Sequence, residues 1–223
     1  LLTDKVEIGD PLVDIVDLDK ANKQLNPGIY DGTTTKVYGY SGGSSVNDNS
    51  TPGFYKYISG MVEPAASVYA NSGFLLEFDL NERFADEPSG FISTKGQQIV
   101  CKYPEYATKK EIEFIKTVWN TAEAVMYDST ATYEELSAVI DVESFAKVYL
   151  IQELTKNLDG GATSYFVSYD GGKLRADVVW DYDWTLGQYG LVYTDRVQDG
   201  SKFKDQIDAD PSEEGGWYIN SEK

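Results

Sequence analysis

Short hydrophobic runs separated by polar and glycine-rich stretches fill the first hundred residues, a pattern typical of a β-rich region. Residues 73–80 are mostly hydrophobic and predict a buried strand, and residues 91–94 and 98–102 predict two shorter strands. A helix is expected at residues 18–25, which end at an Asn-Pro-Gly breaker. Residues 31–72 are rich in Gly, Ser, Asn and Tyr, so we expect a loop-rich insertion there.

The hydrophobic spacing changes to three and four residues after this region, which predicts two long helices. Thr108 and Glu111 have the spacing of a capping box, and hydrophobic residues recur at helical spacing after them. A second helix is expected from Asp141, a good N-cap residue, toward Asn157. We expect Leu154 to lie on the buried face of this second helix.

A β-hairpin is expected after the second helix. Residues 164–169 and 173–180 have strand-like patterns on either side of a Gly-Gly turn. Asp159 precedes the first of these strands, and Asp181 follows the second. Because the two ends of a hairpin lie side by side, the pattern predicts that these two carboxylates are close in space.

Charge and composition exclude several classes of function. The chain has 19 Lys and Arg against 37 Asp and Glu, and the resulting net charge of −18 repels nucleic acid. The absence of His removes Ser-His-Asp and Cys-His hydrolases and His-ligated zinc. No hydrophobic run approaches the roughly 20 residues that cross a bilayer, so no membrane span is expected. Acid–base chemistry must therefore use carboxylates, Tyr or Lys.

The two hairpin aspartates are candidates for a divalent-metal site. Two carboxylates held close together repel each other unless a cation or a shared proton stabilises them. Asp183 could add a third oxygen ligand, and Mg²⁺ and Mn²⁺ prefer oxygen donors. Protein kinases use the same order of elements: a loop Asp, an amide ligand five residues later, a hairpin and a metal-binding Asp. In this chain the residue five after Asp159 is Ser164.

The same residues also allow an interpretation as turn formers. Asn157 would then cap the helix, Asp159 would form an Asx turn, and Asp181 and Asp183 would close the strand. However, these last two carboxylates lie among three large aromatic residues in the stretch 180–184, where unpaired charge is costly. Both interpretations stay open from the residues alone.

The chain resembles the CotH (spore coat protein H) family of atypical kinase-like proteins. The resemblance runs from residue 1 to about residue 190. Its motifs are LLTDKVEI at residues 1–8, GFLLEFD at 73–79, KYP at 102–104, NLD at 157–159 and VWDYDWTLG at 179–187. The last two motifs together are the most specific.

The resemblance implies an α+β fold of the atypical protein-kinase-like type, here partial. Its parts would be a β-rich first half, two long helices and a β-hairpin that carries the acidic site. The implied activity is transfer of the γ-phosphoryl group of ATP, with Mg²⁺ or Mn²⁺, to Ser of proteins, and the implied location is extracellular or on the spore or cell surface of a bacterium. By motif, Asp159 matches the catalytic-loop Asp and Asp181 the metal-binding Asp, with Asp183 and Ser164 as further metal ligands.

The resemblance is incomplete at both ends of the chain. We expect residues 1–190 to form a partial CotH kinase-like domain without its upstream, phosphate-binding lobe. Residues 191–223 are expected to be an acidic, poorly ordered tail or a truncated helical segment, and this chain alone is expected to transfer little phosphate. Glu77 and Lys102 are candidates for contact with the nucleotide, although strand alternation also explains them as solvent-facing residues.

A non-catalytic extracellular binding or scaffolding module, of the spore-coat or cellulosome type, is the competing interpretation. Ser164, where some family members have Asn, fits a site that has lost its activity. The Tyr residues between positions 30 and 69 could stack on sugar rings, but their irregular spacing favours anchoring of loops. The expected partners are a protein with a Ser acceptor or the components of an extracellular assembly. Metal-dependent nucleotide binding separates the two interpretations.

Overall fold

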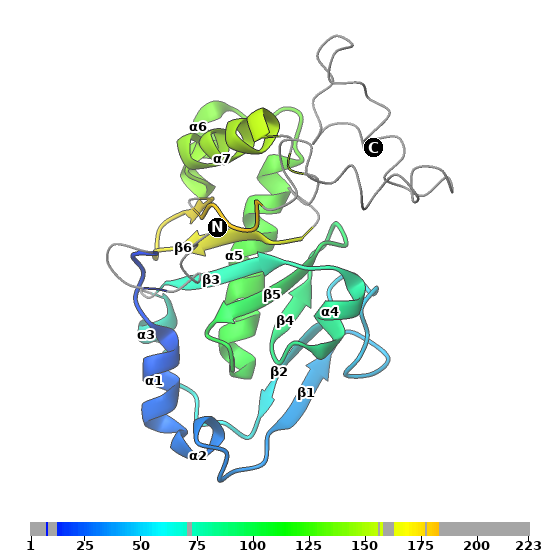
Figure 1. Ribbon diagram of the computed structural model, residues 1–223, viewed down its shortest axis with the longest axis vertical. Helices are drawn as coiled ribbons and strands as arrows, with labels where there is room; N and C mark the ends of the chain where they lie inside the picture. Colours follow the sequence, from blue (N-terminus) through cyan, green and yellow to red (C-terminus); the bar gives the residue numbers. More distant parts are fainter. Residues whose placement is uncertain are drawn as a thin grey trace.

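A seven-stranded antiparallel sheet forms the centre of the part of the chain that the structure describes. The computed structural model describes residues 8, 13–70, 73–155, 157, 163–176 and 178–182. The strands are β1 (Val37–Ser41), β2 (Tyr55–Ser59), β3 (Phe74–Phe78), β4 (Gly90–Ile92), β5 (Gln98–Tyr103), β6 (Tyr165–Tyr169) and β7 (Leu174–Arg175). They lie side by side in the order β1-β2-β4-β5-β3-β6-β7 (Figure 1). The expected α+β class is confirmed.

The long helix α5 (Lys109–Met126) crosses one face of this sheet and forms the main core with it (Figure 1). Ile112, Ile115 and Trp119 project from the helix and are buried. They meet the alternate strand residues that point to the same face, which include Leu76, Ile99, Cys101 and Val167. Each fully buried side chain of this size contributes roughly 1.5–3 kcal/mol by leaving water. This contact joins the first half of the chain to the hairpin that carries Asp181.

The predicted capping box at the start of α5 is confirmed, and it also binds a second helix. The backbone N–H of Glu111 donates to Thr108 Oγ1 at 3.3 Å, and the N–H of Thr108 donates to Glu111 Oε2 at 2.8 Å. Asn22, on α1 (Leu18–Leu25), donates to the same carboxylate at 2.9 Å. Burial raises the pKa of Glu111, while these donors oppose the rise. The short helix α2 (Pro27–Tyr30) follows α1 beyond the predicted breaker.

The short helix α4 (Asn81–Asp86) covers part of the opposite face of the sheet. Phe84 of this helix is fully buried and packs with Phe54, Ile92 and Val100. Farther along the same face, Leu75 and Phe166 form another buried cluster. Between these two clusters lies the pocket described below.

The segment 31–72, predicted to be a loop-rich insertion, contributes two strands to the sheet. Tyr38 of β1 lies opposite Ile58 of β2, and β2 continues the sheet by pairing with β4. The short helix α3 (Ala66–Ala70) also lies in this segment. The loop between β1 and β2 is organised by Asp48, whose carboxylate accepts backbone N–H groups and thereby has a lowered pKa. Tyr and Gly at alternate positions gave β1 the composition of a loop, and only pairing with β2 makes it a strand.

The second predicted helix is α7 (Val142–Thr155), which follows the shorter α6 (Tyr133–Val139). The prediction that Leu154 faces the core was wrong, because 80% of its surface is exposed, whereas Gln152 and Glu153 are buried. The predicted hairpin after α7 is present with a shorter second strand, since β7 has two residues. The expected tail at 191–223 lies outside the described residues.

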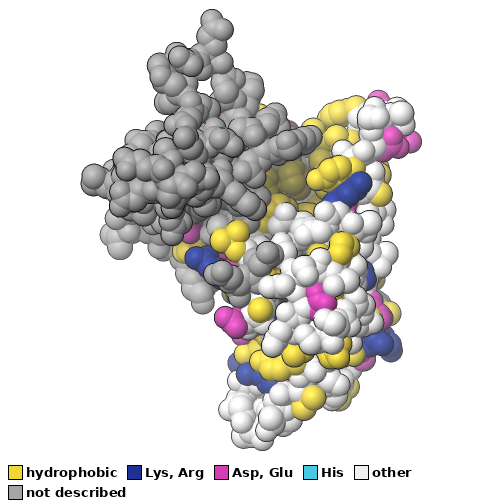
Figure 2. All heavy atoms as spheres, turned by 90° about the vertical axis from the view of Figure 1, so that its right-hand side faces the viewer, with side chains coloured by type: hydrophobic (Ala, Val, Ile, Leu, Met, Phe, Trp, Pro, Cys, Tyr) yellow, Lys and Arg dark blue, Asp and Glu magenta, His cyan; other side chains and the backbone are white. Residues whose placement is uncertain are grey.

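Among the described residues visible in Figure 2, acidic side chains do not gather in one patch. Charged side chains there are scattered among uncharged ones. Within the described residues, none of the helices is both long and apolar enough to cross a membrane.

Candidate functional site

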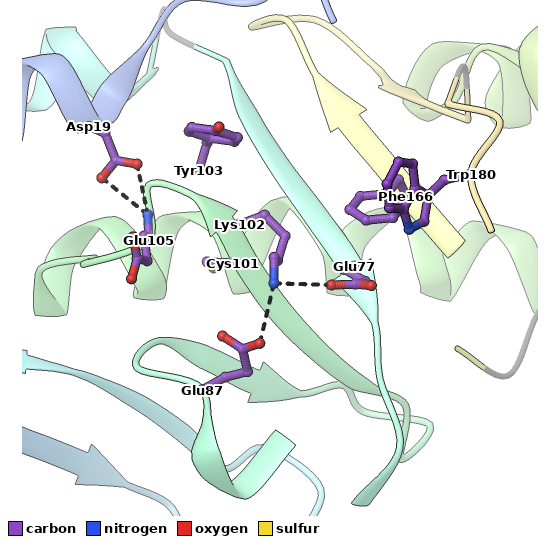
Figure 3. A pocket seen from close by; sticks show the side chains of 9 residues that line it. All are labelled: Asp19, Glu77, Glu87, Cys101, Lys102, Tyr103, Glu105, Phe166 and Trp180. Carbon is purple, nitrogen blue, oxygen red and sulfur yellow. Dashed lines mark hydrogen bonds and ion pairs between the residues drawn. The ribbon is translucent and has the colours of Figure 1, made fainter. Parts of the chain in front are cut away.

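A pocket with a volume of about 380 Å³ opens on the sheet face opposite α5 (Figure 3). This volume lies within the range of about 300–1,000 Å³ that is common for small-molecule sites. The pocket is lined by Asp19, Glu77, Glu87, Cys101, Lys102, Tyr103, Glu105, Phe166 and Trp180. Two of the predicted site residues, Glu77 and Lys102, therefore share one cavity.

Lys102 lies between two carboxylates at the centre of the pocket (Figure 3). Its Nζ is 3.3 Å from Glu77 Oε2 on β3 and 3.2 Å from Glu87 Oε1, which follows α4. Burial disfavours the charged form of Lys102, but the two carboxylates outweigh it and raise the pKa of the ammonium. Burial raises the pKa of Glu77, and Lys102 opposes that rise. Lys102 is thus a fully charged cation in a partly desolvated site.

A β-bulge places Lys102 at this position. Leu75 pairs with Tyr103 and Leu76 with Cys101, so Lys102 is the extra residue on β5. Bulges turn a side chain out of the regular alternation and are common beside active sites. The Lys102 ammonium reaches Glu77 across the strand pair, so the two side chains form a cross-strand ion pair at the pocket.

Phe166 and Trp180 form the apolar end of the pocket (Figure 3). Phe166 comes from β6 and is buried against Leu75, and Trp180 packs on the same cluster. Two large aromatic side chains offer a flat apolar surface on which a ring system can stack. Trp180 directly precedes Asp181, so this end of the pocket adjoins the predicted acidic site.

Asp181 and Ser164 are hydrogen-bonded to each other. The Ser164 hydroxyl donates to Asp181 Oδ2 at 3.0 Å, and Asn157 Nδ2 donates to the Asp181 backbone carbonyl at 3.4 Å. Among the described residues other than glycine, Ser164 and Asp181 are also the two with positive φ, 54° and 57°. A left-handed backbone costs free energy at such residues and is concentrated at functional sites. Because Asp tolerates this backbone in turns, the positive φ of Asp181 fits both the turn interpretation and a functional role.

The backbone of Asn157 ends α7 as the turn interpretation predicts. Its backbone N–H donates to the Gln152 carbonyl at 3.1 Å, as expected of a residue that ends a helix. Its side chain nevertheless reaches the strand end at Asp181. Asn157 thus connects the end of α7 to Asp181, which is hydrogen-bonded to Ser164.

Asp159 and Asp183 lie outside the described residues, so their predicted roles remain predictions. Within the described part of the chain, no group of three or more Asp, Glu or Cys side chains lies so as to hold a metal ion. Asp181 and Ser164 supply two hard oxygen atoms 3.0 Å apart. This donor set suits Mg²⁺ or Mn²⁺, which often use one or two protein oxygens with substrate phosphates and water completing the shell.

Asp19 belongs to the wall of the pocket. Its carboxylate accepts the Tyr30 hydroxyl at 2.6 Å and the Glu105 backbone N–H at 3.1 Å. Burial raises the pKa of Asp19, and these hydrogen bonds oppose the rise. Because both donors come from the protein, Asp19 serves to join α1 to the segment after β5.

Sequence reasoning did not find Glu87. The residue lies in an Asp-Glu-Pro stretch that is typical of a surface turn and carries no motif. Its role depends on the position of α4 over β5, a long-range contact that no local pattern encodes. Trp180 could be found from its place beside Asp181 in the aromatic stretch.

The comparison with protein families identifies the family of this chain. The model of the CotH family, described as CotH kinase protein, matches residues 60–218, which is more than half of the chain. The chain therefore belongs to the CotH kinase protein family. No curated protein and no solved structure matches the chain significantly. The matched range includes Glu77, Lys102, Ser164 and Asp181.

Proposed function

We propose that this protein binds ATP with Mg²⁺ or Mn²⁺ and that the reaction of its site is transfer of the γ-phosphoryl group to Ser of proteins. The observation that carries the proposal is the pocket in which Lys102 and Trp180 both take part, with the strained Asp181–Ser164 pair next to it. Membership of the CotH kinase family supports a phosphoryl-transfer role for this site.

Different pocket residues would bind different parts of the nucleotide. The ring faces of Phe166 and Trp180 offer the base an apolar surface. The Lys102 ammonium donates hydrogen bonds to phosphate oxygens as a fixed positive charge. Asp181 and Ser164 would hold the metal ion, which neutralises phosphate charge when bound.

Charge explains why a divalent cation is needed. Glu77 and Glu87 flank Lys102, so the centre of the pocket has more negative than positive groups. Free ATP is strongly anionic and would be repelled, whereas its metal complex carries less negative charge. We therefore expect nucleotide binding to depend on Mg²⁺ or Mn²⁺.

In the transfer itself, the Ser oxygen of the acceptor forms a bond to the γ-phosphorus while the bond to the β,γ-bridging oxygen breaks, which releases ADP. The family resemblance assigns orientation of the acceptor hydroxyl, and acceptance of its proton, to Asp159. Catalysis of this kind rests on positioning and electrostatics. The expected setting is an extracellular or spore-surface protein, in keeping with the family.

A radiolabel assay tests the proposal. Wild-type chain and Asp159→Ala are each incubated with [γ-³²P]ATP, Mn²⁺ and a Ser-containing acceptor protein, and nucleotide binding is measured in parallel. We expect metal-dependent nucleotide binding by both proteins, and any label transfer to be lost in Asp159→Ala. Label transfer that persists in Asp159→Ala would contradict the role assigned to Asp159. Absence of nucleotide binding at any Mn²⁺ concentration would contradict the proposal.

A further inference from the structure

A buried lysine outside the pocket lining contacts α4, the helix that Glu87 follows. Lys56, on β2, is 1% exposed, which is unusual for a lysine. Its Nζ donates to the backbone carbonyls of Phe84 and Ala85, the latter at 3.1 Å. The ammonium also lies 4.5 Å from the centre of the Phe84 ring.

These contacts fix the C-terminal end of α4. The last carbonyls of a helix have no partner within the helix, and a cation placed there satisfies them and complements the helix dipole. Phe84 itself is fully buried, and its ring packs so closely on Gly90 that a Cβ there would lie 2.9 Å from it. Both the backbone and the side chain of the last helical turn are therefore held.

Glu87 is the residue that directly follows α4. On its other side the chain is anchored at Ser89, whose carbonyl accepts the Cys101 N–H at 3.0 Å and whose hydroxyl accepts the Ala107 N–H at 2.9 Å. The backbone is therefore held on both sides of Glu87. Its carboxylate Oε1 lies 3.2 Å from Lys102 Nζ.

We propose that Lys56 is a positioning residue: by holding the C-terminal carbonyls of α4 it fixes Glu87, and Glu87 in turn fixes the Lys102 ammonium in the pocket. We call this chain of contacts from Lys56 through Glu87 to Lys102 the relay. Its consequence for phosphate binding rests on the proposed function, whereas the relay itself does not. Burial lowers the pKa of Lys56 to about 8, and nearby Glu87, Asp86 and Asp79 oppose this, which agrees with an ammonium that faces the acidic end of α4.

Lys116 supplies a matched control. Like Lys56, it donates from Nζ to a backbone carbonyl, that of Gly53 at 2.8 Å, and lies over an aromatic ring, that of Tyr55 at 4.6 Å. Burial also lowers its pKa. It projects from α5 and is not among the residues that line the pocket, so its removal should leave Lys102 unaffected.

The first measurement needs no nucleotide. Trace labelling with acetic anhydride at pH 8, followed by mass spectrometry of peptides, gives the reactivity of the Lys102 amine. Loss of the fixed Glu87 is expected to lower the pKa of Lys102 and to expose its amine, so Lys56→Met should raise the labelling rate severalfold, and Glu87→Gln should do the same. Lys116→Met should leave that rate unchanged.

The second measurement is nucleotide affinity in the same variants. Lys56→Met is expected to weaken binding of Mn²⁺-ATP by about tenfold, in the lower range for loss of a supporting contact behind a binding residue. In a Lys102→Met background it should have no further effect. If Lys56→Met proves unstable, Lys56→Gln, which retains an N–H donor, takes its place. We expect it to raise the labelling rate of Lys102 too, but by less.

An unchanged labelling rate of Lys102 in a folded Lys56 variant would overturn the relay, whatever the nucleotide result. Faster labelling with no nucleotide binding even by the wild-type chain would support the relay and contradict the proposed function instead.

Discussion

Removal of the Lys102 ammonium is expected to destabilise the protein in a manner that depends on pH. In Lys102→Met the hydrocarbon stem is kept, but Glu77 and Glu87 lose their shared cation. Breaking a fully buried ion pair on one side costs about 3–5 kcal/mol. Here the side chains of Lys102 and Glu77 are 33% and 14% exposed, so solvent screening lowers the cost. We expect a loss of about 1–3 kcal/mol in the free energy of unfolding at pH 7.5.

The sign of the pH dependence follows from Glu77. Burial already raises the pKa of this carboxyl, and loss of Lys102 raises it further. A carboxyl with a raised pKa holds its proton more tightly in the folded than in the unfolded state, so folding stability falls as pH rises through that range. The cost of Lys102→Met should therefore be larger at pH 7.5 than at pH 5.

Urea unfolding followed by tryptophan fluorescence measures this effect at both pH values. The double variant Glu77→Gln/Lys102→Met should recover about 1 kcal/mol, because no unpaired charge is left at position 77. Lys147→Met, which breaks an exposed pair on α7, should cost no more than about 0.5 kcal/mol. Equal losses at both pH values, with no recovery in the double variant, would refute the reasoning.

Three further predictions concern the fold. Ile115→Ala should lower the free energy of unfolding by about 2–5 kcal/mol, because it opens a cavity where α5 meets the sheet; urea unfolding measures this, and a loss below about 1 kcal/mol would contradict the packing. Thr108→Ala should cost about 0.5–2 kcal/mol by removing the N-cap of α5, and Thr108→Ser should restore most of it in thermal unfolding. Gly39→Val should destabilise the sheet edge, because a Cβ at Gly39 would lie 2.5 Å from the Tyr57 ring; an unchanged melting temperature would show that β1 and β2 do not pair in this register.

Local signals in the sequence were sufficient for the elements at the centre of the fold. The capping box at Thr108 with the hydrophobic spacing after it defines α5, and the hydrophobic run at β3 defines a central strand. In both cases the spacing of hydrophobic residues within the segment itself predicts the buried face, so no contact with a distant residue has to be known.

The elements that the sequence missed depend on contacts between distant residues. β1 has alternating Tyr and Gly with exposed side chains, and becomes a strand through its pairing with β2. Leu154 was placed on the core side because it is hydrophobic, whereas α7 buries the polar side chains of Gln152 and Glu153.

The candidate site divides in the same way. The hairpin geometry predicted that Asp159 and Asp181 are close, and the structure shows Ser164, which begins the same hairpin, beside Asp181. The meeting of Lys102 with Glu77 and Glu87 joins β5, β3 and the end of α4 through a bulge, which no spacing rule predicts. The roles of Asp159 and Asp183 still rest on the sequence.

Titration calorimetry with Mn²⁺-ATP tests the central claim, that Asp181 and the Lys102 pocket form one nucleotide site. The wild-type chain is compared with Asp181→Asn, Lys102→Met and the control Asp170→Asn, an exposed aspartate at the turn of the same hairpin. The account predicts that the wild type and Asp170→Asn bind Mn²⁺-ATP equally, that Asp181→Asn and Lys102→Met each bind it at least about tenfold more weakly, and that all four remain folded. Equal binding by all four proteins would contradict the account and leave Asp181 as a turn residue.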